Sequence, residues 1–331
     1  MTPVTHAARV PIDVLAIDVG GSSIKAARYD REGLVLDAFR TPTPPPSRLA
    51  GEITAVARRL CGPGTAAVGV VTPGVIDDGV LRYATNLGVR DLPLRDLVSR
   101  TVALPTALGH DLAAAALAES TAIDRDLLFV GLGTGIGAGL VTDGRPWRGA
   151  TGRACELGHI CVVPGGEPCG CGQLGCLEVY ASAAGLARRY ATATGNADAA
   201  GRDVGVRAGL DAAAIVDRLA TDPVAATVWN QAVQALAHAL ATAVQLFDPA
   251  VVVLGGGLAT AGPALFDPVR AALEERLRWR PAPEIRPALL GADASRAGAA
   301  LLAWRLLSDM KAAGEAAGEA TENPYEKGAI R

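Results

Sequence analysis

One short segment holds a histidine and three cysteines at spacings that suit a metal ion. His159, Cys169, Cys171 and Cys176 form the pattern H-x9-C-x-C-x4-C. An imidazole and three thiolates complete a tetrahedral zinc site with no open position for water. A metal held in this way folds a loop and does not activate a reactant. We therefore predict a structural Zn²⁺ site.

Three other interpretations of this segment are weaker. Disulfides require an oxidising compartment, and Met1–Pro11 lacks the apolar core of a secretory signal. Gly170–Gly175 matches G-x-G-x-x-G, but a lone match without a strand, a helix and a ribose-binding acid is a weak nucleotide motif. The H-x-E and P-C-x-x-C motifs of zinc deaminases are absent. Glu156 and Glu178 flank the segment, where a metal-folded loop would fix their carboxylates to grip a ligand.

Three glycine clusters each follow an apolar run that is typical of a buried strand. They are Gly20–Gly21 after Val14–Ile17, Gly131–Gly139 after Leu127–Val130, and Gly255–Gly257 after Ala250–Leu254. Glycines at strand ends let backbone N–H groups approach phosphate oxygens. Ser22, Ser23 and Thr134 add hydroxyl groups, and Lys25 is the first lysine of a chain that otherwise uses arginine. No Gly-Lys-Ser/Thr sequence occurs, which excludes a Walker A loop.

The elements around these clusters predict a mixed α/β protein. The first two clusters occupy the tips of similar hairpins, which indicates two duplicated halves. A strand over Thr65–Val71 leads to Gly74, and an alanine-rich helix begins at Asp111. Further helices are expected from Glu178 to about Tyr190 and over Ala225–Phe247.

Composition narrows the function classes. The chain has 331 residues, of which 50% are hydrophobic and 4% aromatic, and a net charge of -3. A chain with this net charge lacks the excess of positive charge that is typical of proteins that bind nucleic acid or an acidic membrane surface. The apolar stretches are interrupted by polar residues, so we expect no membrane span and a cytoplasmic protein.

In their order along the chain, these motifs resemble the ROK family of sugar kinases, within the actin and hexokinase superfamily. The resemblance extends from about Asp18 to Ala300. It implies an α/β fold of two duplicated ribonuclease-H-like (actin-like ATPase) domains around a central cleft. A small domain would comprise residues 12–118 and about 297–311, and a larger one residues 119–296 with the zinc loop. We expect disorder at residues 1–11 and 312–331, whose composition is polar or repetitive.

The resemblance also assigns the phosphate-binding residues and a catalytic base. ATP and Mg²⁺ would bind in the cleft through Asp18, Gly20, Gly21, Ser22, Ser23, Lys25, Gly133, Thr134, Gly135, Gly137, Gly255 and Gly256. Phosphoryl transfer needs a base that accepts the proton of the attacking hydroxyl group. Asp111 occupies the family's position for that base.

The sugar contacts implied by the resemblance include one departure from the family pattern. They are Gly74, Asn86, His110, Asp111, Glu156, His159 and Glu178, and the carboxylates suit hydroxyl groups. His159 could bind zinc through one ring nitrogen and the sugar through the other. The family commonly has asparagine where this chain has His110, which puts the substrate in question.

The expected activity is phosphorylation of a hexose at its 6-hydroxyl group, with glucose as the first candidate. N-acetylmannosamine, N-acetylglucosamine and fructose are alternatives within the same class, and a homodimer is expected by the resemblance. A sugar-responsive repressor would need a DNA-binding segment before the Asp18 strand, where we expect none. A sugar sensor without activity is disfavoured because Asp111 and both hairpins are intact.

Overall fold

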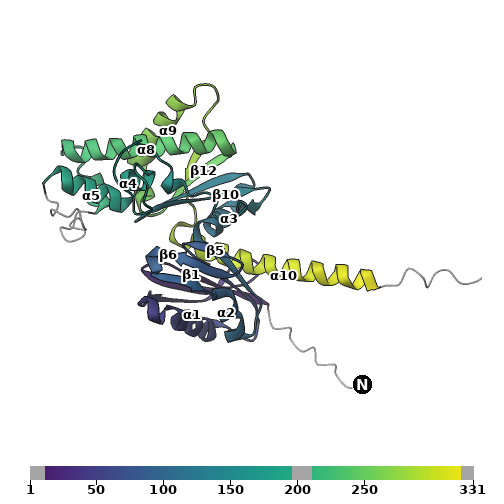
Figure 1. Ribbon diagram of the computed structural model, residues 1–331. Coiled ribbons are helices and arrows are strands. Elements are labelled where there is room, and N and C mark those ends of the chain that lie inside the picture. Colours follow the sequence, from purple (N-terminus) through teal and green to yellow (C-terminus); the bar gives the residue numbers. More distant parts are fainter. Residues whose placement is uncertain (1–11, 196–210, 322–331) are drawn as a thin grey trace, which may run out of the picture. The chain divides into compact units, whose positions relative to one another are not determined.

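The computed structural model describes residues 12–195 and 211–321 (Figure 1). Two compact units make up the chain. Unit 1 comprises the residues up to Ala114 and those from Ser295 onward, and unit 2 comprises Ala115–Ala294. The prediction placed these two boundaries at residue 118 and at about residue 297. The chain thus leaves unit 1, forms unit 2 and returns to unit 1.

A five-stranded sheet forms the centre of unit 1. Its strands lie in the order β3 (Val35–Pro42), β2 (Ser23–Tyr29), β1 (Asp13–Val19), β4 (Thr65–Thr72) and β8 (Thr106–His110). Strand β1 is antiparallel to β2 and parallel to β4, and β4 is parallel to β8. All residues of β1 are buried, as expected of a central strand covered on both faces. The carboxyl ends of β1, β4 and β8 therefore share one edge of the sheet.

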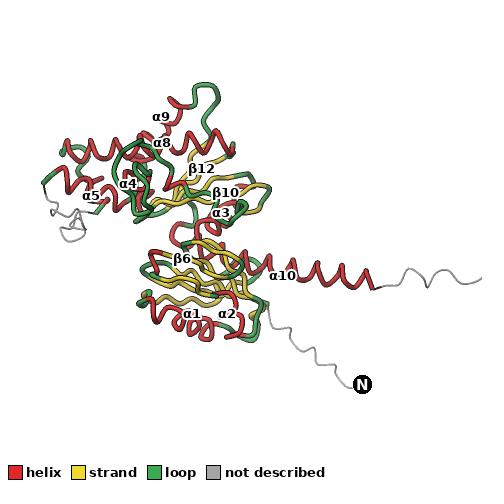
Figure 2. Tube along the Cα trace, in the orientation of Figure 1, coloured by secondary structure: helices red, strands yellow, loops and turns green. Residues whose placement is uncertain are grey.

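Helices cover both faces of this sheet (Figure 2). They are α1 (Pro46–Leu60), α2 (Leu94–Val102), α3 (Asp111–Ile123), which continues into unit 2, and α10 (Ala294–Thr321). Leu15 and Ile17 of β1 share a core with side chains of α1 and α2. Val14 and Ala16 share the opposite core with side chains of α3 and α10. Alternate side chains of one strand thus build two cores.

A small antiparallel sheet completes unit 1. It contains β5 (Val75–Asp77), β6 (Val80–Ala84) and β7 (Val89–Leu92), with a 3-10 helix η1 (Thr85–Leu87) between the last two strands. This sheet follows β4 directly, so the loop after the carboxyl end of β4 is held by residues of β6.

Unit 2 repeats the strand pattern of unit 1. Its strands lie in the order β11 (Arg145–Pro146), β10 (Ile136–Thr142), β9 (Leu127–Leu132), β12 (Val251–Gly255) and β13 (Glu284–Pro287). The first three are antiparallel neighbours, and β9, β12 and β13 are parallel. The same order and the same directions recur in both units, which confirms the predicted duplicated α/β fold.

The helices of unit 2 pack around one large core. They are α4 (Leu177–Ala181), α5 (Ala183–Ala193), α7 (Ala212–Asp217), α8 (Pro223–Phe247) and α9 (Pro263–Arg276), with 3-10 helices η2 (Leu157–His159), η3 (Gly257–Ala261) and η4 (Gly291–Asp293). The single helix predicted from Glu178 to Tyr190 is interrupted at Ser182. The Ser182 hydroxyl accepts a hydrogen bond from Gly185 N and caps α5, so a new helix starts there.

The end of α10 differs from the expectation. The helix continues to Thr321, where disorder was expected from residue 312. Its repeated alanine and glutamate residues favour helix strongly enough to outweigh the interspersed glycines. Residues 1–11 and 322–331, for which disorder was also expected, lie outside the described residues.

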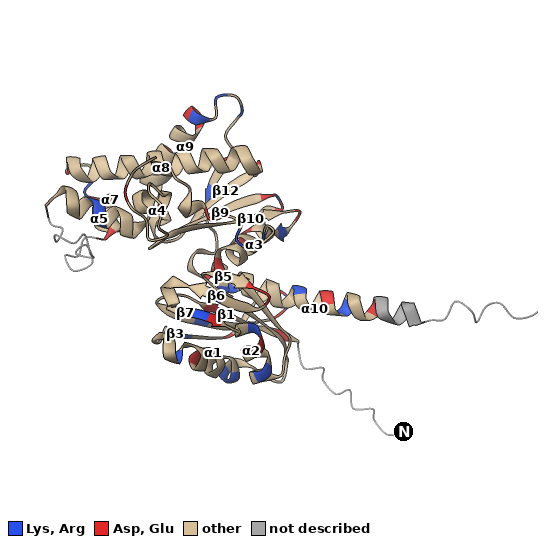
Figure 3. Cartoon of the chain, in the orientation of Figure 1, with Lys and Arg blue, Asp and Glu red and all other residues tan. Residues whose placement is uncertain are grey.

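Charged residues of both signs occur along both units (Figure 3). Helix α8 is the exception, since none of its 25 residues is Lys, Arg, Asp or Glu. Its apolar side chains are largely buried in the core of unit 2. Within the described ranges, neither α8 nor another helix has the length and apolarity needed to cross a membrane.

Candidate active site and metal centre

Three parallel strands of unit 1 bring polar residues to one edge of their sheet. Asp18 of β1 lies opposite Val71 of β4, and Thr72 lies opposite His110 of β8. Asp111 follows His110 as the first residue of α3. Ligands of α/β proteins bind outside the carboxyl ends of parallel strands. The structure thus places the predicted metal-orienting acid and the predicted base at the same edge of one sheet.

The first hairpin has two free backbone donors at its tip. Gly20 N donates to Ser23 O at 3.1 Å and closes the turn. In the described part of the chain, Gly21 N and Ser22 N have no hydrogen-bond acceptor. Thr43 braces the tip from the end of β3, because its N donates to Ser22 O at 3.1 Å and its Oγ1 donates to Gly20 O. The sequence reading missed Thr43, which lies far from the glycine motif along the chain.

An acid and a lysine lie opposite each other at the base of this hairpin. Asp18 and Lys25 are paired in register, and Lys25 Nζ is 3.9 Å from Asp18 Oδ2. Asp18 is only 7% exposed, whereas the Lys25 side chain is 22% exposed. The lysine therefore retains access to solvent while it balances a largely buried carboxylate.

The predicted base is oriented by the first turn of its helix. Asp111 Oδ1 accepts a hydrogen bond from Leu112 N at 2.7 Å. The same N–H lies 3.3 Å from His110 Nδ1, and that nitrogen lies 3.2 Å from Asp111 Oδ1. The Asp111 side chain is 22% exposed. A carboxylate that is fixed by a backbone donor and still open to solvent is suited to accept a proton from a bound hydroxyl group.

The two predicted minor sugar contacts lie in the loops after β4. Gly74 has a φ of 105°, and a Cβ there would lie 2.3 Å from Tyr83 O. This turn therefore requires glycine. Asn86 of η1 is exposed, and its Cβ lies 3.6 Å from the place that a Cβ on Gly21 would take. The structure thus brings Asn86 to the tip of the first hairpin.

The second hairpin repeats this arrangement in unit 2. Gly133 N donates to Gly135 O at 3.0 Å, and Thr134 is exposed. Neither Thr134 N nor Gly135 N has an acceptor among the residues that the structure describes. The two hairpins are therefore alike in leaving two successive N–H groups free at a glycine-rich tip, a geometry that suits phosphate oxygens.

The third glycine cluster lies beside this hairpin. Gly255 of β12 is paired with Gly131 of β9, and Gly137 of β10 is paired with Gly131 from the other side. Gly256 has a φ of 85°, and a Cβ there would lie 2.4 Å from Leu132 O. The turn after β12 can approach the end of β9 this closely only with glycine.

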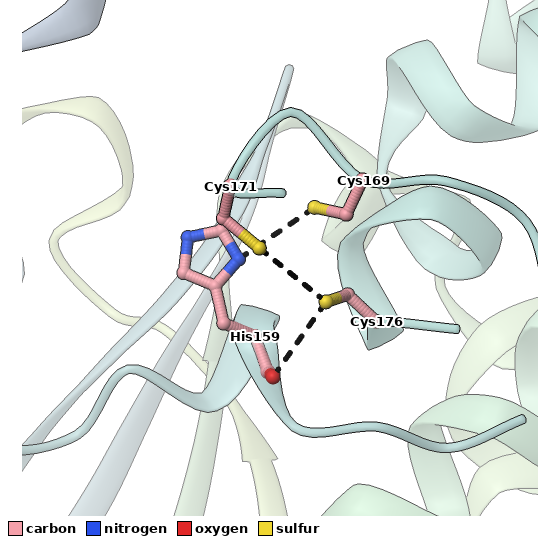
Figure 4. A group of neighbouring side chains, drawn as sticks. All are labelled: His159, Cys169, Cys171 and Cys176. Atoms are coloured by element: carbon pink, nitrogen blue, oxygen red, sulfur yellow. Dashed lines mark hydrogen bonds between the residues drawn. The ribbon is translucent and has the colours of Figure 1, made fainter. Parts of the chain in front are cut away.

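The predicted metal ligands of unit 2 converge in space (Figure 4). The ligand atoms of His159, Cys169, Cys171 and Cys176 all lie within 4.8 Å of one another. Cys171 Sγ is 3.6 Å from Cys176 Sγ, and Cys169 Sγ is 3.8 Å from His159 Nδ1. Two sulfurs on a tetrahedral zinc lie about 3.8 Å apart, given a Zn–S distance of about 2.3 Å. The four side chains therefore fit a Zn²⁺ ion, with Nδ1 as the ligating atom of His159.

Burial and the neighbouring thiols determine the protonation of Cys176 in the absence of a metal ion. Desolvation and the neighbouring thiols raise the pKa of Cys176 to about 12. This thiol would stay protonated at neutral pH in the absence of a metal ion, whereas a bound Zn²⁺ displaces the proton.

A polar network outside the ligand set anchors the metal loop. Glu167 accepts one hydrogen bond from Arg189 at 2.8 Å and forms an ion pair with Arg188, both on α5. Partial burial opposes its ionisation, but the two guanidinium groups hold the pKa of Glu167 below its usual value. Glu167 N donates to the Tyr180 hydroxyl at 2.8 Å. No local signal in the sequence identifies this anchor, because its partners lie on a different element.

The three main predicted sugar contacts lie on or next to the elements that carry the metal ligands His159 and Cys176. Glu156 precedes η2 and is exposed, and His159 ends that helix. Because Nδ1 of His159 faces the cysteines, its Nε2 remains for another partner. Glu178, on α4, accepts a hydrogen bond through Oε2 from Ile136 N at 2.9 Å. Ile136 belongs to the second hairpin, and this contact was not predicted.

Comparison with known proteins agrees with these sites. A sequence model of the ROK family matches residues 14–305. The chain is 34% identical over 307 residues to a glucokinase of Streptomyces coelicolor, with 87% of this chain and 96% of the relative covered. It is also 34% identical over 302 residues to an N-acetylmannosamine kinase of Salmonella arizonae, covering 87% and 97%.

A solved structure extends the agreement to the fold. The crystal structure of a ROK family glucokinase from Streptomyces griseus in complex with glucose and AMPPNP aligns with a TM-score of 0.75 at 34% identity. The alignment covers 88% of this chain and 99% of that one. The chain therefore belongs to the ROK family and is one of its ATP-dependent sugar kinases.

Proposed function

We propose that this kinase transfers the γ-phosphoryl group of ATP to the 6-hydroxyl group of glucose. The observation that carries the proposal is Asp111, whose carboxylate is held by Leu112 N at the carboxyl end of β8 and remains partly exposed. The similarity to glucokinases over most of the chain supports glucose as the acceptor.

Asp111 acts as the base in this proposal. As the sugar hydroxyl oxygen forms a bond to the γ-phosphorus, its proton passes to the Asp111 carboxylate. The bond from the γ-phosphorus to the bridging oxygen breaks, and ADP leaves with that electron pair. Positioning and charge neutralisation supply most of the rate in such reactions. The hydrogen bond from Leu112 N, which orients the Asp111 carboxylate, therefore contributes to catalysis in this proposal.

The two hairpins hold the phosphates. The free N–H groups at both tips, together with Ser22, Ser23 and Thr134, are donors for phosphate oxygens. Lys25 adds a compact positive charge. Asp18 would orient Mg²⁺, and the ion would supply positive charge to neutralise the β- and γ-phosphates. Gly255 and Gly256 form the adenosine-side turn in this assignment.

The metal centre shapes the sugar contacts and takes no part in the transfer. Zinc bound by His159, Cys169, Cys171 and Cys176 would fix the loop that carries Glu156 and His159, and would fix the start of α4 ahead of Glu178. Their acceptor atoms would bind sugar hydroxyl groups by charge-assisted hydrogen bonds. Gly74, Asn86 and His110 are proposed as further contacts from unit 1.

N-acetylmannosamine is the second candidate acceptor, since kinases for that sugar match this chain at the same identity as glucokinases. His110 stands where the family commonly has asparagine, and it lies next to the base. An imidazole differs from an amide in size and in the number of donors it offers. The choice of acceptor is therefore expected to depend on this residue. N-acetylglucosamine and fructose are the remaining candidate acceptors.

A coupled ADP-release assay over these four sugars tests the proposal. We expect kcat/KM for glucose to exceed the others by at least about tenfold, a discrimination that differences in a few pocket contacts can supply. Phosphorus NMR of the product should show glucose 6-phosphate. A higher kcat/KM for N-acetylmannosamine would reassign the acceptor. Absence of turnover with every sugar would instead favour a sugar sensor or regulator.

The family resemblance also leads us to propose a cytoplasmic homodimer. Light scattering of the purified protein tests the oligomer directly. A mass of about one chain at micromolar concentration would contradict it. Fractionation of the cells that produce the protein tests the location.

A further inference from the structure

The metal segment, α4 and the first residue of α5 contact the second hairpin at three points. Glu178 Oε2 accepts from Ile136 N at 2.9 Å. Ala183 N donates to Gly133 O at 2.9 Å. A Cβ on Gly158 would lie 2.0 Å from Ile136 O, so the backbone of η2 packs directly on the hairpin. Ala183 thus contacts the first residue of the Gly133–Ile136 tip, and Glu178 and Gly158 contact its last residue.

Glu178 is the one side chain among these contacts, and the hairpin is shaped to receive it. A Cβ on Gly135 would lie 2.5 Å from Glu178 Oε2, so the carboxylate occupies the space above that glycine. Ile136 N is the next donor after Thr134 N and Gly135 N, the two that have no acceptor in the described chain. By accepting from this third N–H group, Glu178 restrains the Gly135–Ile136 peptide, which adjoins the two free N–H groups.

A short covalent path joins this contact to the metal. Cys176 is both a proposed zinc ligand and the N-cap residue of α4, and Glu178 lies in the first turn of that helix. His159, on η2, is a second ligand, and Gly158 beside it packs on Ile136. The metal thus fixes two elements that both rest on the hairpin.

We propose that Glu178 is a positioning residue for the nucleotide phosphates, through which the zinc loop controls the shape of the second hairpin. One carboxylate oxygen holds the hairpin. The other, Oε1, accepts no hydrogen bond within the described part of the chain and is available to a sugar hydroxyl group. The proposal rests on the proposed phosphate role of the hairpin. It predicts that loss of the metal weakens nucleotide binding even without sugar.

Three variants of the zinc-loaded protein separate the two roles of Glu178. Binding of AMP-PNP with Mg²⁺ is measured by titration calorimetry in the absence of sugar. Glu178→Ala should weaken it by about tenfold or more, as expected when a hydrogen bond to a charged group is lost. Glu178→Gln keeps an acceptor oxygen and should bind AMP-PNP within about twofold of wild type while binding glucose more weakly. Glu274→Ala is the matched control and should leave AMP-PNP affinity unchanged, since Glu274 is exposed on α9 and makes no side-chain contact with the hairpin in the described residues.

Unchanged AMP-PNP affinity in Glu178→Ala would overturn the proposal. A wild-type protein that binds no AMP-PNP at all would contradict the proposed function instead. Whether the metal acts through Glu178 is tested by measuring AMP-PNP affinity with and without zinc, in wild type and in Glu178→Ala, as a double-mutant cycle. The loss of AMP-PNP affinity on removal should be smaller in the variant, and an equal loss would show that the metal does not act through Glu178.

Hydrogen exchange of the wild-type hairpin gives a readout that does not depend on any variant. The amide of Ile136 should exchange faster after zinc removal under conditions where circular dichroism shows the protein still folded. Unchanged exchange in a peptide covering residues 131–140 would overturn the proposal.

Discussion

Asp18 and Lys25 face each other across the first hairpin, with Lys25 Nζ 3.9 Å from Asp18 Oδ2. The acid is almost fully buried and the lysine is partly exposed. A carboxylate in this position would lose too much solvation without a nearby cation or a bound metal ion. The pair therefore suits the proposed roles of Asp18 toward Mg²⁺ and of Lys25 toward phosphate.

Lys25→Met should raise the KM for ATP by about tenfold, because a point charge beside the phosphates is removed. Steady-state kinetics at saturating glucose measures this effect. Lys311→Met is the control, since Lys311 is on the exposed part of α10 and pairs only with Glu315 among the described residues. An unchanged KM in Lys25→Met would show that the lysine serves the fold alone.

The sequence identified those parts of the site that depend on local patterns. Glycine clusters after apolar runs predicted both hairpins, and the spacing of His159 and the cysteines predicted a cluster that the structure brings within 4.8 Å. A histidine and cysteines in one segment can converge only over a short loop, so their spacing is informative.

Contacts between distant segments could not be predicted in this way. Glu178 meets Ile136, 42 residues away, and Glu167 meets arginines of α5, 22 residues away in the case of Arg189. In the sequence, nothing next to any of these residues distinguishes it from an ordinary surface or strand residue. The interruption of the predicted helix at Ser182 has a local cause, since a serine hydroxyl can cap a new helix as readily as it can continue an old one.

His110→Asn should change acceptor choice more than catalytic rate. Leu112 N still orients Asp111 in this variant, so kcat with the preferred sugar should stay within about threefold of wild type. The ratio of kcat/KM for glucose to that for N-acetylmannosamine should change by about tenfold, as expected for one altered polar contact. His238→Asn, at an exposed position of α8, is the control. An unchanged ratio would remove His110 from the sugar contacts.

Removal of the metal should lower thermal stability. A chelator, or Cys171→Ser, should reduce Tm by at least about 5 °C, since 1 kcal/mol shifts a domain of this size by about 2–4 °C. Differential scanning calorimetry with metal analysis measures both quantities. Cys161→Ser is the matched control, because Cys161 is exposed beside the cluster and is not one of its four members. Equal Tm values with and without zinc would contradict the structural role.

Asp222 should make a pH-dependent contribution to stability. A hydrogen bond from Tyr190, and those from Ala225 N and Val224 N at the start of α8, lower the pKa of Asp222 below its usual value. A lowered pKa in the folded state stabilises the protein above the unfolded pKa, and this contribution is lost as pH falls through the folded pKa. Asp222→Ala should therefore lower Tm equally at pH 7 and pH 5.

The same Tm difference should narrow as the pH falls below about 4, because the Asp222 carboxyl group takes up a proton first in the unfolded chain and, at lower pH, in the folded protein. Asp217→Ala, at the exposed end of α7, is the control and should leave Tm unchanged at each pH. A difference that persists at low pH would show that the ionised carboxylate is not the cause.

Glucose-dependent ADP release by wild type and by Asp111→Asn, measured side by side, tests the central claim most directly. Wild type should release ADP only when glucose is present. Asp111→Asn should lower kcat by about 10²–10⁴-fold, the usual contribution of a general base, while glucose still binds. Undiminished turnover in Asp111→Asn, or no glucose-dependent turnover in wild type, would contradict the account.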